Sequence, residues 1–202
     1  MSEKDQDTAS KIKEAASRLF QEKGFGRTTT RDIATEAGVN LALVNYYFRS
    51  KDELFKTIML ETIEGFVGQL HVLMNDDHSF EQKVELVVGN YISLLKQRPD
   101  LPLFMLSEVR NHPDELVERL GLRKLMLQAK FFEELAQRCP EGILPIHLFA
   151  NLLSMTVFPF IAKPLLSAGI GLNDEAFNMM MEQRKQLIPQ WFMSMLKPKN
   201  EE

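Results

Sequence analysis

Short helical patterns, separated by glycines and helix-capping residues, follow one another within the first quarter of the chain. Apolar residues at three- and four-residue spacing predict an amphipathic helix over Thr8–Lys23, ending at Gly24. Thr29 and Asp32 have the spacing of a capping box, and Gly38 ends the short helix that this box begins. The segment therefore predicts small helices joined at tight corners.

A third short helix is predicted over residues 40–47, because Asn40 is a suitable N-cap and the apolar pattern runs to about Phe48. Ser50 and Glu53 then have the spacing of a second capping box, which opens a long helix. Two short helices that are joined by a glycine turn and braced by a longer one place the second short helix on the outside of the unit. The sequence thus predicts a helix-turn-helix arrangement.

The rest of the chain also has helical spacing. A long helix continues past Leu54 until Asn75, and Ser79 with Gln82 caps the next helix, which runs to about Arg98. Pro99 and Pro102 are predicted to interrupt the chain, and further helices are expected over residues 113–138, 145–167 and 173–196. No segment alternates with a period of two for long enough to form a sheet. We predict an all-α fold of about nine helices.

Charge divides the chain into two parts. Residues 8–56 hold nine basic and six acidic side chains, a net charge of +3, whereas the whole chain carries −4. A basic head on an acidic body is consistent with a part that faces phosphates, although +3 alone decides little. We predict two domains, a helix-turn-helix domain over residues 8–56 and a larger helical domain for ligand binding and dimerisation over residues 57–198.

Residues 24–55, GFGRTTTRDIATEAGVNLALVNYYFRSKDELF, resemble the signature of the tetracycline-repressor-like (TetR) family. The matching positions are Gly24-Phe25, Thr28 to Thr30, Ile33-Ala34, Ala37-Gly38-Val39, Tyr47-Phe48, Lys51 and Leu54. This resemblance implies a DNA-binding transcriptional regulator that forms a homodimer through its last two helices. It also implies a cavity for a small-molecule effector in the second domain.

The resemblance also implies which residues contact double-stranded DNA. The positions are Thr30, Arg31, Leu41, Ala42, Leu43, Asn45, Tyr46, Tyr47 and Lys51. Among them, Thr30 and Arg31 match backbone or base contacts, and Tyr47 and Lys51 match phosphate contacts.

Helical spacing sorts the third helix into two faces. It directs Val44 and Phe48 to the core and leaves Leu41, Ala42, Asn45 and Tyr46 outside, with Leu43 shared. Apolar residues on an outward face are better explained by contact with thymine methyl groups than by contact with water. Where the family usually has Tyr, this chain has Asn45, which can pair with adenine and is our candidate for reading a base.

For the effector we expect a soft, largely apolar pocket, and the candidates are Phe104, Met105, Met126, Phe131, Met155 and Phe158. Ordinary core packing is the alternative for each of these six residues. Arg110, Gln128 and Asn151 are possible polar groups in the pocket, although a solvated surface is the simpler interpretation for each.

Other functional classes find little support. The apolar stretch Leu148–Ala162 is shorter than the ~20 residues needed to cross a bilayer. The four histidines form no metal-ligand set, and no phosphate loop or nucleophile motif is present, so we predict neither an enzyme nor a cofactor or metal. The polar start of the sequence and the single cysteine, Cys139, predict a cytoplasmic protein without disulfides.

The function predicted from the sequence is therefore a homodimeric repressor. Two copies would read a palindromic operator, and a small, largely apolar ligand would release them from it. The alternative is a DNA-binding protein with a structural, chromosome-organising role and no small-molecule inducer.

Overall fold

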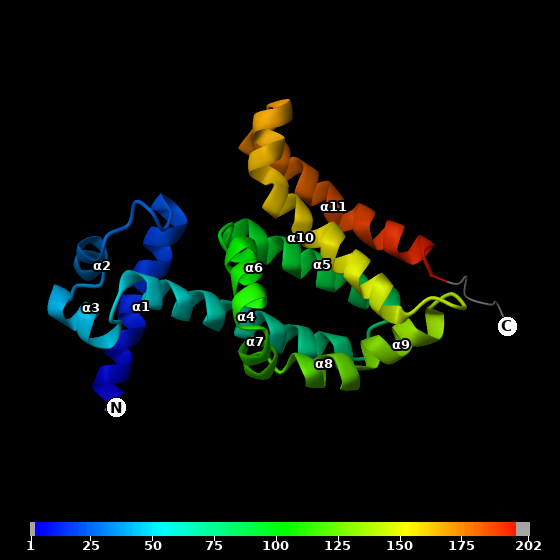
Figure 1. Cartoon of the computed structure of the whole chain (residues 1–202), viewed down its shortest axis with the longest axis horizontal. Helices are drawn as coiled ribbons and strands as arrows, with labels where there is room; N and C mark the ends of the chain where they lie inside the picture. The colour runs from blue at the N-terminus through cyan, green and yellow to red at the C-terminus, as the bar shows by residue number, and fades with distance from the viewer. Residues whose placement is uncertain (1–2, 197–202) are drawn as a thin grey trace. The chain divides into compact units, whose positions relative to one another are not determined.

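The computed structural model of the chain describes residues 3–196, which form eleven α-helices and contain no β-strand (Figure 1). The all-α prediction is confirmed, although the helices number eleven rather than about nine. The chain divides after Gly65 into two compact units. Residues 197–198, where the second predicted domain ends, lie outside the described residues.

The first unit contains three complete helices and the first part of a fourth. These are α1 (Glu3–Lys23), α2 (Thr30–Glu36), α3 (Leu41–Tyr47) and α4 (Lys51–Asn75), of which α4 continues into the second unit. The helices enclose a core made of small and aliphatic side chains with one aromatic ring. Its buried members are Ile12, Ala16, Leu19, Phe20, Ile33, Ala34, Val44, Leu54 and Ile58.

The predicted corners of the first unit are confirmed. The Thr29 hydroxyl accepts from the Asp32 backbone N–H (3.1 Å), and the Asp32 carboxylate accepts from the Thr29 N–H (2.9 Å). The Asn40 side chain accepts from the Leu43 N–H at 2.9 Å and begins α3. Gly38 lies between these two helices with φ +66°, which an L side chain rarely adopts, so the turn favours glycine there.

The second unit contains the end of α4 and seven further helices. These are α5 (Phe80–Gln97), α6 (Leu101–Asn111), α7 (Pro113–Arg119), α8 (Leu122–Gln128), α9 (Lys130–Arg138), α10 (Pro145–Ile170) and α11 (Asp174–Ser194). The aromatic core gathers around Phe80 at the start of α5. Its ring stacks on Phe131 of α9, with centroids 5.1 Å apart, and lies 6.4 Å from the ring of Phe192 of α11.

Two predictions for this unit are wrong. Pro102 does not interrupt the chain but lies in the first turn of α6, where a missing N–H costs no helical hydrogen bond. Residues 113–138 form three helices instead of one. The breaks fall at Gly121, which has φ +61°, and at Ala129, which is extended. Apolar spacing continues across both breaks, so it did not reveal them.

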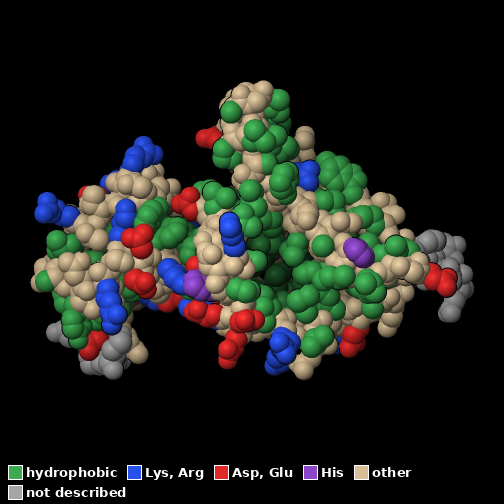
Figure 2. Space-filling view, viewed as in Figure 1, with side chains coloured by type: hydrophobic (Ala, Val, Ile, Leu, Met, Phe, Trp, Pro, Cys, Tyr) green, Lys and Arg blue, Asp and Glu red, His purple; other side chains and the backbone are tan. Residues whose placement is uncertain are grey.

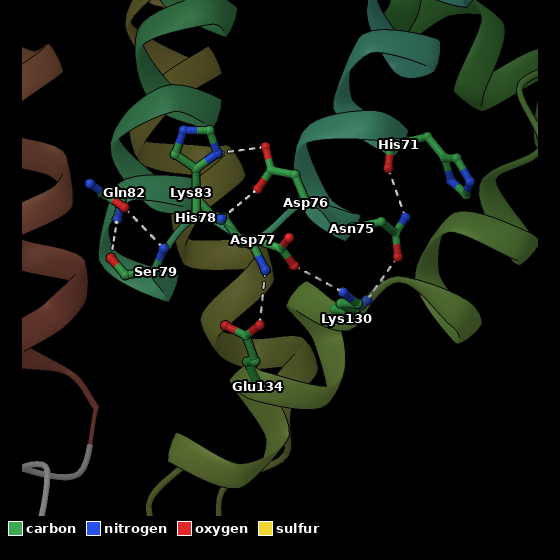
Figure 3. A network of polar contacts seen from close by, with 10 residues as sticks. All are labelled: His71, Asn75, Asp76, Asp77, His78, Ser79, Gln82, Lys83, Lys130 and Glu134. Carbon is green, nitrogen blue, oxygen red and sulfur yellow. Dashed lines mark hydrogen bonds and ion pairs between the residues drawn. The ribbon is translucent and has the colours of Figure 1, made fainter.

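An ion pair between a buried lysine and a partly exposed glutamate holds the corner between α4 and α5 against α9 (Figure 3). The Lys83 side chain is only 1% exposed, and its ammonium donates to Glu134 at 2.9 Å. Nearby, the side-chain oxygen of Asn75 accepts from the backbone N–H of Lys130 at 3.2 Å. A charge as deeply buried as that of Lys83 is tolerated only when it is paired, so Glu134 fixes α9 on α5.

The helix α10 is longer than its apolar stretch suggested. It has 26 residues, so length and composition alone would allow it to cross a bilayer, and our argument from a short stretch is wrong. One third (33%) of its most apolar window is buried within the chain. The presence of one such helix is weak support for a membrane span, because a core helix of a soluble protein has the same composition.

A proline inside α10 creates a contact with α11. Pro159 has no N–H, so the carbonyl of Met155, four residues earlier, lacks its helical donor. Arg184 of α11 supplies the missing bond and donates to the Met155 oxygen at 2.7 Å. The Arg184 guanidinium also lies 5.3 Å from the ring of Trp191. The proline and the arginine together lock the two helices in register.

Candidate nucleic-acid interface

The outward face of α3 is formed by Ala42, Asn45 and Tyr46, all of which are exposed. The ring of Tyr46 is the most prominent, with 77% of its surface exposed, whereas Val44 on the opposite face is buried. The predicted orientation of these four residues is confirmed. An exposed aromatic ring beside an amide and a methyl group offers a surface that can contact base edges and sugars.

Leu41 was predicted to lie on this outward face, but it does not. It is half-buried and packs against the core of the first unit, because the first turn of α3 faces the end of α2. Leu43 is also half-buried, in agreement with the shared position expected for it. The apolar character of α3 therefore has two sources, the core on one side and an exposed surface on the other.

Tyr47 and Lys51 have partners inside the unit. The Tyr47 hydroxyl donates to the Asp5 carboxylate at 3.0 Å, and desolvation together with this carboxylate raises the pKa of Tyr47. The Lys51 ammonium donates to the backbone oxygens of Phe25 (2.8 Å) and Thr28 (2.9 Å) and lies 4.1 Å from the centre of the Phe25 ring. Both side chains brace the ends of α3 and α4 against α1 and the loop that follows it.

The cations of the first unit differ in whether an acid neutralises them. Three cations of α1 pair with nearby acids, Lys11 with Asp7 (2.6 Å), Lys13 with Glu61 (2.6 Å) and Arg18 with Glu36 (3.1 Å). Arg31 at the start of α2 and Arg49 before α4 are exposed, and neither forms an ion pair within residues 3–196. Thr30, beside Arg31, is half-buried. Arg31 and Arg49, which have no counter-charge within the described residues, thus lie next to the two short helices.

Residues 12–58 match the family described as "Bacterial regulatory proteins, tetR family". These residues form a DNA-binding domain of the TetR family. The relatives of the chain are transcriptional regulators, so this protein is a DNA-binding regulator and, as predicted, not an enzyme.

Relatives extend the likeness beyond the first unit. The probable transcriptional regulator YttP of Bacillus subtilis is 28% identical over 167 residues, 79% of this chain and 80% of its own length. The nucleoid occlusion factor SlmA of Aliivibrio fischeri is 22% identical over 143 residues, 66% of this chain and 73% of its own length. FadR of Bacillus subtilis, solved with stearoyl-CoA, shares the fold with a TM-score of 0.62. It is 18% identical, and the match covers 92% of this chain and 97% of FadR.

The pocket residues expected in this protein are not brought together in one place. Phe131 is completely buried in the aromatic core, and Phe158 on α10 is 62% exposed. Phe104, Met105 and Met155 are half-buried, and Met126 is partly exposed. The possible polar groups Arg110, Gln128 and Asn151 are all exposed, in line with the simpler interpretation of each.

Hollows are nevertheless present in the second unit. Figure 2 shows a depression rimmed by apolar side chains, which in the same view lies among α5, α6, α8 and α10 (Figures 1 and 2). A separate open groove of about 700 Å³ runs along α7 and α8 and includes Val117, Lys124 and Leu127. Its mixed lining of charged and apolar side chains differs from the soft apolar pocket that the sequence predicted.

Sequence reasoning missed two side chains of the second unit. Arg184 was not considered, although a proline in the interior of a neighbouring helix is a signal that some donor must replace its N–H. Tyr91 was also not considered, although it is the one tyrosine of the second unit. It lies in the middle of the apolar stripe of α5, where a hydroxyl needs an explanation.

Proposed function

We propose that this TetR-family protein is a cytoplasmic, homodimeric repressor that a small, largely apolar ligand releases from its operator. The observation that carries this proposal is the exposed face of α3, with unpaired arginines on either side of it. This surface remains largely exposed, with the Tyr46 ring in edge contact with the Tyr47 ring, and its chemistry matches the major groove and the phosphates along the edges of that groove.

On DNA, α3 would enter the major groove with Ala42, Asn45 and Tyr46 toward base edges and sugars. Arg31 would neutralise a phosphate, and Thr30 would lie near the sugar-phosphate backbone of the DNA. Leu41 and Leu43 would contribute from the edges of the helix. Tyr47 and Lys51, whose polar atoms have partners inside the unit, would act mainly by holding α3 in place, and each keeps some exposed surface for a phosphate.

Dimerisation would supply the second half of the interface. A recognition helix of seven residues contacts too few base pairs for a specific affinity, whereas two copies about 34 Å apart read a palindrome. Large apolar side chains remain exposed on the last two helices. They are Ile146, Phe158, Leu165 and Ile170 on α10, and Met179, Leu187 and Trp191 on α11. A second copy packed on these helices would cover them.

Release would follow if the ligand binds better to a dimer whose α3 helices are wrongly spaced for DNA. The apolar hollow of the second unit and the complex of FadR with stearoyl-CoA support an effector of this kind. The helix α4 has residues in both units. A change at the effector cavity in the second unit could therefore reach the DNA-binding unit along this helix.

The second candidate is a structural, chromosome-organising role without an effector, which the likeness to SlmA favours. The two candidates differ in what they need from DNA. A repressor requires a few specific sites and a ligand that releases them, whereas an organising protein requires many sites and no release.

The deciding experiment is binding of the purified protein to the DNA upstream of its own coding region, over a series of salt concentrations. We expect site-selective binding that Tyr46→Ala weakens. Arg31→Ala should weaken binding and reduce the slope of log K against log salt by about 1, because one phosphate contact is lost. Arg18→Ala is the matched control, since Arg18 is already paired with Glu36 and should leave this slope unchanged.

Weak binding without sequence preference would contradict the repressor proposal and favour the organising role. The proposed base contact has its own test. Asn45→Ala should relax the preference for adenine at one position of the site, at a cost of about 1 to 3 kcal/mol in discrimination. An unchanged base preference in this variant would show that Asn45 does not read a base.

A further inference from the structure

Tyr91 is half-buried at a position of α5 where its neighbours are fully buried. Residues four positions apart lie on the same face of a helix, and both Val87 and Leu95, on either side of Tyr91, are buried in the core. Val88 and Ile92, which border the same stripe, are also buried. A closely packed core would cover Tyr91 as well. Its remaining exposure shows that this side chain borders a space that solvent can reach.

The hydroxyl of Tyr91 has no hydrogen-bond partner among the described residues. The ring packs beside Phe66 of α4, with centroids 4.8 Å apart, so the apolar part of the side chain is held in place. Burial raises the pKa of Tyr91 to about 12, and the phenol is therefore neutral at physiological pH. An oriented, neutral donor without a partner in largely apolar surroundings can be satisfied by a ligand that supplies an acceptor.

We propose that Tyr91 is the polar anchor of the effector cavity and that it donates to the carbonyl oxygen of a neutral, mainly apolar ligand of the ketone, ester or thioester class. This inference rests on the effector-responsive function proposed above and names the chemistry of its ligand. It places the cavity against the middle of α5, beside Phe66, rather than at the six apolar residues expected from the sequence.

The lysines of α5 support a neutral ligand, because both already have a carboxylate partner, and Lys96 pairs with Glu182 at 2.6 Å. Lys83, the cation buried on α5, already pairs with Glu134 at 2.9 Å. A ligand carboxylate that reached Tyr91 would therefore lose its hydration without gaining the Lys83 charge. A carbonyl oxygen loses far less on leaving water and needs only the one donor that Tyr91 provides.

The test uses the full-length protein without DNA and two probes, 2-octanone and octane. Each probe is titrated against bound N-phenyl-1-naphthylamine, a neutral fluorescent dye. We expect Tyr91→Phe, which keeps the ring, to weaken the displacement by 2-octanone about 3- to 10-fold. The octane concentration needed to displace the dye should differ by less than about twofold between Tyr91→Phe and wild type, since an alkane cannot accept a hydrogen bond. Tyr46→Phe, on the exposed face of α3, is the matched control and should change neither titration.

Several outcomes would overturn the proposal. Tyr91→Phe could leave the 2-octanone titration unchanged or shift both probes equally, which would show that the hydroxyl anchors nothing. If wild-type protein fails to bind 2-octanone, the cavity or the ligand class is wrong. If octanoate binds more tightly than 2-octanone and is insensitive to Tyr91→Phe, the inference of a neutral ligand fails.

Failure of the proposed function has a different signature. One such outcome combines two assays: 2-octanone displaces the dye in a Tyr91-dependent way, but in a separate operator-binding assay it leaves the protein on DNA. That result would refute release by the effector and leave the anchor standing. If an apolar ligand releases the protein from DNA equally well in wild type and in Tyr91→Phe, the proposed role of Tyr91 fails, but release by an effector stands.

Discussion

The two units of the chain hold their helices in place by different means. In the first unit the corners depend on side chains a few residues apart, such as Thr29 with Asp32 and Asn40 with Leu43. In the second unit the decisive contacts join distant helices, such as Lys83 with Glu134 and Arg184 with Met155. The corners of the first unit are therefore fixed locally, and Tyr47 and Lys51 add longer-range contacts that brace α3 and α4, close to the surface that we assign to DNA. The second unit is fixed only when many helices have come together, and α5 can border an open space there.

The largest expected effect tests the long-range contacts through the ion pair of Lys83 with Glu134. Glu134→Ala removes the one carboxylate that accepts from the buried Lys83 ammonium and leaves only the more distant charge of Asp76, so we expect the free energy of unfolding to fall by about 3 kcal/mol. Lys83→Met should cost less than half of this, because the remaining Glu134 carboxylate is partly exposed to water. Urea unfolding followed by circular dichroism measures both losses.

The double variant Lys83→Met with Glu134→Gln is the control for this pair. It removes both charges and should recover most of the stability lost in Glu134→Ala. A Glu134→Ala variant as stable as wild type would show that α9 is not fixed on α5 by this pair, and the contrast between the two units would weaken.

The next effect concerns the contact between α10 and α11. Arg184→Met should lower the free energy of unfolding by about 1 to 2 kcal/mol, since the Met155 carbonyl loses its donor. In a Pro159→Ala background the residue at position 159 regains an N–H that can bond Met155, so the same arginine change should cost less than half as much. A double-mutant cycle of chemical unfolding measures the coupling. Equal costs in the two backgrounds would mean that the proline and the arginine act independently.

The smallest effect is local to the first unit. Thr29→Ala removes the cap of α2 and should cost about 1 kcal/mol of stability. Thr29→Ser keeps the hydroxyl and serves as the control. The loss should appear in thermal unfolding and should accompany weaker binding to operator DNA, because the same cap orients Arg31 at the start of α2. If DNA binding is unaffected in Thr29→Ala, the local corner is not what positions the proposed phosphate contact.

Predictability from sequence follows the same division. The caps at Thr29, Asn40 and Ser79 were all located correctly, because a capping motif is a local arrangement and its spacing is visible in the chain. The long helices α10 and α11 were also predicted, with starts at residues 145 and 173 that agree with the observed ones.

The errors occur where distant residues decide the outcome. The breaks at Gly121 and Ala129 fall within a continuous apolar pattern, so three helices were taken for one. Phe131 was assigned to a pocket, but its stacking on Phe80 places it in the core. A core and a cavity are lined by the same kinds of apolar residue. Only the packing of the whole unit shows which of the two a given side chain belongs to.

The position of Phe80 has a consequence for the order in which the protein forms during synthesis. A chain is made from its N-terminus, and domains fold as units once their residues are available, at about 5 to 20 residues per second. The first unit can close its core soon after Gly65 has been made. Phe80 can contact Phe192 only after roughly 110 further residues have been synthesised, which takes about 6 to 20 s. The nascent protein thus passes through a period in which its DNA-binding unit can already be folded while the aromatic core of the second unit is still incomplete.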